Sequence, residues 1–235
     1  MSALYIVQSW SGAIMLSDKS ANSSVHDAKD LNFSVPKLFR VYPNIYAGCA
    51  GSVPIYKKAL DDLAAGLYEN YPIADASGLP TAAEVLRDLS VKLMQAASDY
   101  GKNRSMESDK NFSDDARVFL VMAGSYVAPE DIAAGQSTSC YVLETGNSYK
   151  PERIPGTMLH TFSELANAVW EHPSLSSIRR QGILQQFQVL LGIHKLCSTL
   201  GTYISEDYNA VVVGRKKYTV LHGTLVDLPS QHLVY

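Results

Sequence analysis

The sequence has few cysteines, no long apolar run and no excess of basic charge. Three cysteines stand far apart among the 235 residues, and neither their number nor their spacing is typical of a disulfide framework or a metal centre. We expect Cys49, Cys140 and Cys197 to be reduced, buried and structural. The formal net charge of −3 gives no basic field for nucleic acid. No apolar run approaches the about 20 residues that span a bilayer.

The first residues, "MSALYIVQSW", also lack features of a secretory signal. They contain neither a basic segment nor an apolar stretch followed by a small-residue cleavage site. We therefore expect a soluble, cytoplasmic protein that needs no metal or other cofactor. A hydrophobic content of 46% is sufficient for one sizeable core, and we expect a single domain over residues 2–235.

What the sequence does contain is an alternation of strand and helix patterns. Short runs rich in Tyr, Ile, Val and Phe predict strands over residues 3–10, 13–17, 37–42, 45–50, 117–127, 137–146, 208–214 and 217–223. Apolar residues at helical spacing predict helices over residues 54–71, 81–100, 161–173 and 175–200. Thr81 with Glu84, and Thr161 with Glu164, match the capping-box pattern of helix N-termini. The polar stretch 101–116 predicts a loop.

The order of these elements indicates the fold class. Strands, two helices, strands, two helices and strands fit helix pairs packed on both faces of two stacked antiparallel sheets. The prediction is an α+β protein, a four-layer αββα sandwich. An ordinary two-layer α+β arrangement produces a similar order of elements, so the positions of motifs must decide between the two.

Two segments carry a resemblance to a known family. "SGAIMLSDKSANSS" and "PKLFRVYPNIYAGCAGS" resemble the first part of proteasome β-subunits and of the related bacterial HslV peptidase, which are N-terminal nucleophile (Ntn) hydrolases. In that family a hydroxyl residue opens the first strand, an Asp ends the second, a Lys begins the third and a Gly follows the fourth. These places fall here on Ser2, Asp18, Lys37 and Gly51. The resemblance is specific over residues 2–60.

The spacing of these residues supports the resemblance. Sixteen positions separate Ser2 from Asp18, and fourteen separate Lys37 from Gly51, as the family pattern requires. The segment 23–34 is a few residues longer, which a surface loop tolerates. Taken singly, Asp18 and Gly51 are typical turn residues and Lys37 is typical of an edge strand. Their combination favours a catalytic site.

The resemblance implies a role for each residue. The Ser2 hydroxyl is the nucleophile and its own α-amino group is the base, because an amine with a pKa of about 7.7–8.0 is partly neutral near pH 7. Lys37 makes the local potential positive and lowers the pKa of that amine, while Asp18 orients the lysine. The backbone N–H of Gly51 is the oxyanion donor, where a side chain would crowd the substrate.

The segment "TYISEDYNAVVVG" resembles the family's closing stretch, in which a serine hydrogen-bonds near the terminal amine. Ser205 takes this place. Three residues earlier the family usually has an Asp, and this chain has Thr202; "IPGTMLH" offers a further hydroxyl at Thr157. A first specificity pocket, small and moderately apolar, is predicted from Asn22, Val35 and Cys49. We expect His194 to be a partly buried structural histidine.

Three functions remain open from the sequence. The first is a self-compartmentalised peptidase that cleaves peptide or amide bonds through an acyl-enzyme, assembled as a homo-oligomeric ring whose ATPase partner, if it has one, is unknown. The second is an enzyme that delivers the same acyl group to an amine. The third, motivated by Thr202 and Met1, is a non-catalytic assembly subunit. The catalytic alternatives require removal of Met1, which a small second residue permits.

Overall fold

The computed structural model describes residues 3–21, 33–72, 78–104, 115–156, 159–161, 164–200 and 204–228. The chain is a mixed α/β protein. These residues hold five α-helices, a five-stranded sheet, a six-stranded sheet and a two-stranded ribbon. This content agrees with the α+β class predicted from the sequence.

The five-stranded sheet is antiparallel at each of its pairings. Its strands, in spatial order, are β10 (Leu159–Thr161), β1 (Leu4–Ser9), β2 (Gly12–Asp18), β11 (Tyr208–Val213) and β12 (Tyr218–His222). Every residue of β1 and β2 is buried, so both faces of the sheet are covered at this point. Gly12 opens β2 because a Cβ there would lie 2.3 Å from the carbonyl oxygen of Val213.

The six-stranded sheet is antiparallel except at one edge. Its strands, in spatial order, are β13 (Val226–Asp227), β5 (Leu38–Tyr42), β6 (Ile45–Gly51), β7 (Ala116–Ala123), β8 (Thr138–Glu144) and β9 (Glu152–Ile154). The C-terminal strand β13 pairs in parallel with β5. The separate ribbon joins β3 (Ser20–Ala21) to β4 (Phe33–Ser34).

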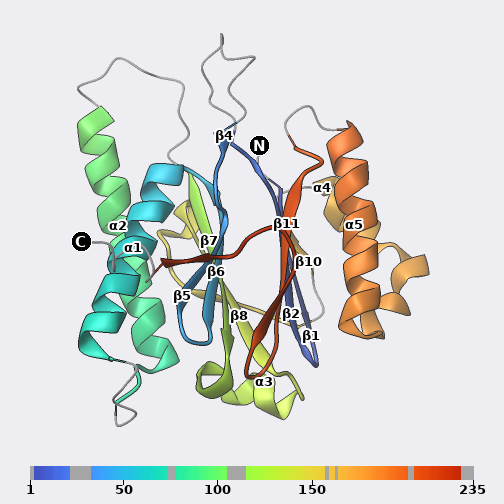
Figure 1. Cartoon of the computed structure of the whole chain (residues 1–235), viewed down its shortest axis with the longest axis horizontal. Helices are drawn as coiled ribbons and strands as arrows, with labels where there is room; N and C mark the ends of the chain where they lie inside the picture. The colour runs from blue at the N-terminus through green and yellow to red at the C-terminus, as the bar shows by residue number, and fades with distance from the viewer. Residues whose placement is uncertain are drawn as a thin grey trace.

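Helices lie on both sides of the two sheets (Figure 1). The α-helices of the described residues are α1 (Val53–Asn70), α2 (Ala82–Arg104), α3 (Pro129–Ala133), α4 (Glu164–Glu171) and α5 (Ile183–Leu200). In the view of Figure 1, α1 and α2 are at the left of the sheets, and α4 and α5 at the right. In the described residues, no helix is both apolar enough and long enough to cross a bilayer.

Three buried clusters hold these parts together. The first joins α1 and α2 to the six-stranded sheet, the second lies between the two sheets, and the third joins the five-stranded sheet to α4 and α5. Alternate residues of β1 enter different clusters: Leu4 and Ile6 belong to the second, and Tyr5 and Val7 to the third. The alternation follows from the two-residue period of a strand.

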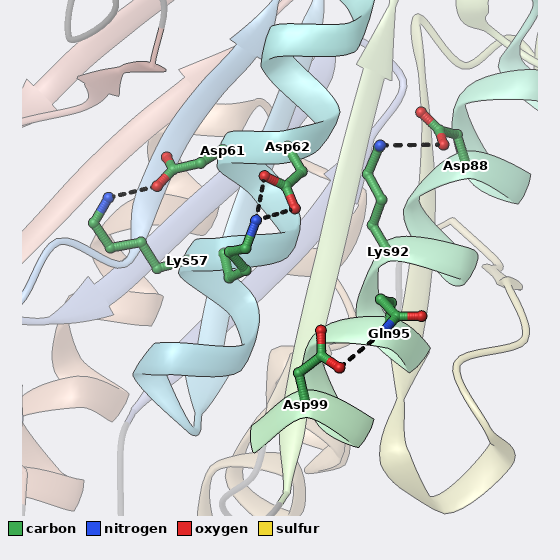
Figure 2. Close-up of polar contacts among 8 residues, drawn as sticks. Lys57, Asp61, Asp62, Asp88, Lys92, Gln95 and Asp99 are labelled. Carbon is green, nitrogen blue, oxygen red and sulfur yellow. Dashed lines mark hydrogen bonds and ion pairs between the residues drawn. The ribbon is translucent and has the colours of Figure 1, made fainter. Parts of the chain in front are cut away.

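The outer surfaces of α1 and α2 carry several ion pairs. Ion pairs spaced one helical turn apart join Lys57 to Asp61 at 2.7 Å and Lys58 to Asp62 at 2.5 Å, and Figure 2 shows them with similar contacts on α2. Exposed pairs of this kind each stabilise a helix by only about 0.3–0.5 kcal/mol. The apolar residues of both helices lie mostly in the first cluster, so burial of that face supplies most of their stability.

The predicted capping box of α2 is confirmed. The Thr81 N–H donates to Glu84 Oε2 at 2.7 Å, and the Glu84 N–H donates to Thr81 Oγ1 at 3.2 Å. The helix then continues to Arg104, four residues beyond the predicted end and into the stretch expected to be a loop. Residues 105–114 of that stretch lie outside the described residues.

Two further predicted boundaries are wrong. The helix predicted over 175–200 begins at Ile183, and short 3₁₀ turns occupy Pro173–Leu175 and Ile178–Arg180. Serines favour turns over helix interiors and glycine is a poor helix former, so regular helix starts only after Gly182. The strand predicted over 117–127 ends at Ala123, because Gly124 has a φ of +64° and turns the chain.

Candidate active site

A buried ion pair joins the two sheets at one end of their strands. Asp18 is the last residue of β2, and Lys37 directly precedes β5. The Lys37 Nζ lies 2.5 Å from Asp18 Oδ1, and the two side chains are 2% and 0% exposed. The predicted meeting of these residues is therefore present in the structure. Each sheet contributes one partner.

The Asp18 carboxylate also binds the start of the first strand. Its Oδ1 atom accepts the backbone N–H of Ala3 at 2.9 Å, and the Asp18 N–H donates to the Ala3 carbonyl at 3.0 Å. One carboxylate oxygen thus contacts both the lysine ammonium and the peptide group that follows Ser2. Ser2 itself lies outside the described residues.

The environment of Lys37 shapes its protonation. Burial lowers the pKa of the Lys37 ammonium from its ordinary value, while the charge of Asp18 and the hydrogen bond to it act in the opposite direction. A hydrogen bond from β6 fixes the Lys37 backbone, because the Lys37 carbonyl accepts the Cys49 N–H at 2.8 Å. The ammonium therefore has a fixed position and a carboxylate partner that offsets part of the cost of its burial.

Gly51 ends β6 at the exposed rim of the six-stranded sheet. Its φ is +87°, and a Cβ at this position would lie 2.1 Å from the carbonyl oxygen of Asp115. Crowding of a substrate was the reason expected for a glycine here, and the structure supplies a different one. The backbone conformation and the neighbouring strand already require glycine, whatever binds beside it.

Ser205 precedes β11 at the same end of the five-stranded sheet as Asp18. Tyr208, the first residue of β11, is directly opposite Asp18 in the pairing of β11 with β2. The Ser205 Oγ accepts the N–H of Asp207 at 3.1 Å, which fixes a turn just before the strand. Thr202 and Thr157 lie outside the described residues.

The predicted pocket residues have different environments. Asn22 lies outside the described residues, and Val35 is half-buried. Cys49 is fully buried in the first cluster together with Tyr56, and burial raises the pKa of its thiol well above the ordinary value. The Cys49 side chain is therefore part of the packed first cluster and is not exposed at the surface, where a pocket residue was predicted. As predicted, Cys49, Cys140 and Cys197, all among the described residues, are buried and form no disulfide.

His194 is more deeply buried than predicted. Its side chain, on the inner face of α5, is 2% exposed. Its ring lies edge-on to Tyr5 of β1 and to Tyr208 of β11, with ring centroids 5.7 Å apart in both cases. Burial lowers the pKa of His194, and the backbone of Glu206 and Ser205 and the charge of Asp18 partly oppose this shift. The sequence placed His194 near helical spacing from Leu190 and Cys197, which indicated its face but not its depth.

The described residues contain no group of three or more His, Cys, Asp or Glu side chains that could hold a metal ion. Compared with known proteins, the chain matches no protein-family model and no curated protein sequence.

Proposed function

We propose that the chain is an N-terminal serine hydrolase of the Ntn type, which cleaves peptide or amide bonds through an acyl-enzyme. In this proposal the two helix pairs and two large sheets form the four-layer αββα sandwich of that family, as one domain over residues 2–235. The three buried clusters, one for each contact between layers, support this interpretation.

One observation carries the proposal. The Asp18 carboxylate, fully buried, accepts hydrogen bonds from Lys37 Nζ and from the N–H of Ala3. A buried ion pair is costly to form, and apolar residues of similar volume often give equal or greater stability. An ion pair retained in contact with the backbone N–H of Ala3 therefore points to a chemical role for the charge.

The proposed reaction starts with proton transfer within one residue. The α-amino group of Ser2 accepts the hydroxyl proton as Ser2 Oγ attacks the substrate carbonyl, and it later gives a proton to the leaving amine. The Lys37 ammonium stabilises the negative charge that develops and lowers the pKa of the amine. The Gly51 N–H donates to the oxyanion, and Ser205 orients the amine. Water then releases the acyl group.

The proposal also covers processing and assembly. The amine is available only in a chain that begins at Ser2, so cleavage before Ser2 precedes activity. We further propose a cytoplasmic homo-oligomer of the ring-forming kind, with peptides or small amides as substrates. The same acyl-enzyme could pass its acyl group to an amine, and product analysis separates transfer from hydrolysis.

The test compares the wild-type protein with Ser2→Ala on a panel of fluorogenic peptide amides. We expect turnover to fall by at least about a thousandfold in Ser2→Ala, because the nucleophile is lost, and intact mass to place the N-terminus of the active protein at Ser2. Equal turnover by the two proteins, or activity in a chain with residues retained before Ser2, would contradict the proposal.

A further inference from the structure

The C-terminal part of the chain crosses from one sheet to the other. We call residues 223–228 the crossing segment. It leaves β12 at Gly223, whose φ is +71°, and the Thr224 N–H donates to Asn209 Oδ1 of the five-stranded sheet at 2.8 Å. Two residues later β13 begins in the six-stranded sheet, and Figure 1 shows the red end of the chain running across to β5.

The crossing segment pairs with β5 at its last strand, β13. Val226 is paired with Phe39 and Asp227 with Arg40 in a parallel ladder. The Arg40 Nη1 lies 2.9 Å from Asp227 Oδ2, with both side chains about one-third exposed. Leu228, which follows, is 1% exposed and belongs to the first cluster. Backbone pairing, an ion pair and the buried Leu228 side chain therefore all attach this end of the crossing segment to the six-stranded sheet and its cluster.

Arg40 also reaches the opposite sheet. Its guanidinium lies 5.8 Å from the ring centroid of Tyr218 in β12. Tyr218 in turn meets Tyr46 of β6 edge-on, with ring centroids 5.4 Å apart. A cation over an aromatic ring is attracted to its face, so Arg40 links β5, the crossing segment and β12 at one place.

These contacts can affect the Asp18–Lys37 ion pair because its two partners come from different sheets. Asp18 is the last residue of β2, and Lys37 directly precedes β5. On one side β5 is paired with β6. On the other side its partner is β13, without which β5 would be an edge strand with unpaired backbone groups. The position of Lys37 relative to Asp18 therefore depends on how firmly β5 is held.

We propose that the crossing segment is a clasp that holds β5 against the five-stranded sheet and so sets the contact between Lys37 and Asp18, with Arg40 and Asp227 as positioning residues. The claim that the crossing segment holds β5 concerns only the fold. The claim that this affects catalysis rests on the proposed function.

The test measures amide hydrogen exchange in residues 37–42 of the full-length protein. We expect Asp227→Ala to speed exchange there about fivefold, because a partly exposed ion pair supports only part of the strand, and Asp227→Asn to do so less strongly. The charge-swapped pair Arg40→Asp with Asp227→Arg restores the ion pair but not the contact of Arg40 with Tyr218, so its exchange should be slower than that of Arg40→Asp alone. Unchanged exchange in Asp227→Ala, or exchange in the swapped pair as fast as in Arg40→Asp alone, would overturn the proposal.

A matched control lies in the same sheet. Arg117 and Glu144 form a cross-strand pair between β7 and β8 at 2.6 Å, with exposures of 39% and 29% against 27% and 37% for Arg40 and Asp227. Glu144→Ala should leave exchange in residues 37–42 unchanged. An equal increase in this control would show a general loss of stability and would overturn the clasp.

Activity supplies the second readout. In Asp227→Ala we expect kcat to fall about threefold with KM nearly constant, and the acid limb of the pH–rate profile to move. An unchanged kcat and profile, with faster exchange at β5, would overturn the catalytic part of the clasp. If Ser2→Ala retains full turnover, the proposed function fails, while the exchange experiment still decides the clasp by itself.

Discussion

At the scale of single residues, the Asp18–Lys37 pair is the feature that needs a chemical explanation. Both side chains are buried and bonded at 2.5 Å. Lys37→Ala would leave the Asp18 carboxylate buried without its ammonium, and the loss of one partner from a buried pair costs about 3–5 kcal/mol. We expect that decrease in the free energy of unfolding, measured by urea denaturation, together with loss of turnover.

Lys57 provides the control for this substitution. It forms a pair of similar length, 2.7 Å, with Asp61 on the outer face of α1, where its side chain is 50% exposed. Lys57→Ala should change stability by less than about 0.5 kcal/mol. A Lys37→Ala protein as stable as Lys57→Ala would contradict the role given to the buried pair.

Gly51 supports a second prediction at this scale. Gly51→Ala must adopt a φ of +87° and place a Cβ 2.1 Å from the Asp115 carbonyl oxygen, so we expect a loss of about 2 kcal/mol or more. A Cβ added at Gly66 in α1 would meet nothing within 4 Å, and Gly66→Ala should stabilise the helix by about 0.5–1 kcal/mol. Thermal unfolding of both variants checks the contrast. A Gly51→Ala protein as stable as Gly66→Ala would refute it.

At the scale of elements, α5 and its contact with the five-stranded sheet give a pH-dependent prediction. The pKa of His194 is lowered by burial, so the unfolded chain, with an ordinary value near 6.5, binds more protons than the folded one at mildly acidic pH. The contribution of His194 therefore makes the free energy of unfolding fall as the pH drops below about 6.5, and this contribution is constant above that pH. Tyr5, Tyr208, Glu206 and Asp18 are the titratable neighbours of this ring.

His194→Phe keeps an aromatic ring between β1 and β11 but cannot take up a proton. We expect the difference in unfolding free energy between pH values of about 5 and 7.5 to be smaller in this variant than in the wild type. His222→Phe is the control, because its exposed ring also contacts Tyr208, at a centroid distance of 4.3 Å. An identical pH dependence in wild type and His194→Phe would rule out the effect of His194.

The elements also show what the sequence could and could not predict. Strands β1, β2, β5 and β6 follow from runs of β-branched and aromatic residues, and α2 from its periodicity and from Thr81 with Glu84. Strand β13 has two residues, too few for any periodic pattern. The pairing of Asp227 with Arg40 spans 187 positions, and no local property of either residue indicates it.

The candidate site was predictable to the same extent. The ends of β2 and β5 could be located by periodicity, but the meeting of Asp18 with Lys37 was indicated only by the family resemblance. The conformation of Gly51 was not predictable, because it depends on the approach of Asp115 from the start of a distant strand. The depth of His194 depends on how α5 rotates against its sheet, which spacing alone does not determine.

At the scale of the whole molecule, assembly remains a prediction. Ion pairs lie on both α1 and α2, and α2 also exposes Val91 at 53% and Met94 at 45%. We expect a homo-oligomer, because exposed apolar side chains three residues apart on one helix lie side by side and favour an interface. Light scattering should give a multiple of the monomer mass, and Val91→Asp with Met94→Asp should reduce it. A monomer at micromolar concentration would remove the argument for a compartmentalised peptidase.

The central claim is that Ser2 is the nucleophile, and covalent labelling by a β-lactone tests it most directly. The hydroxyl of an activated serine opens the lactone ring to form a stable ester, with no leaving group and no second reactant. Peptide mapping of the labelled protein should place one adduct on Ser2 of a chain that begins at that residue, and Ser2→Ala should take up none. An adduct on another residue, or an unmodified Ser2 in a protein that hydrolyses peptide amides, would contradict the account.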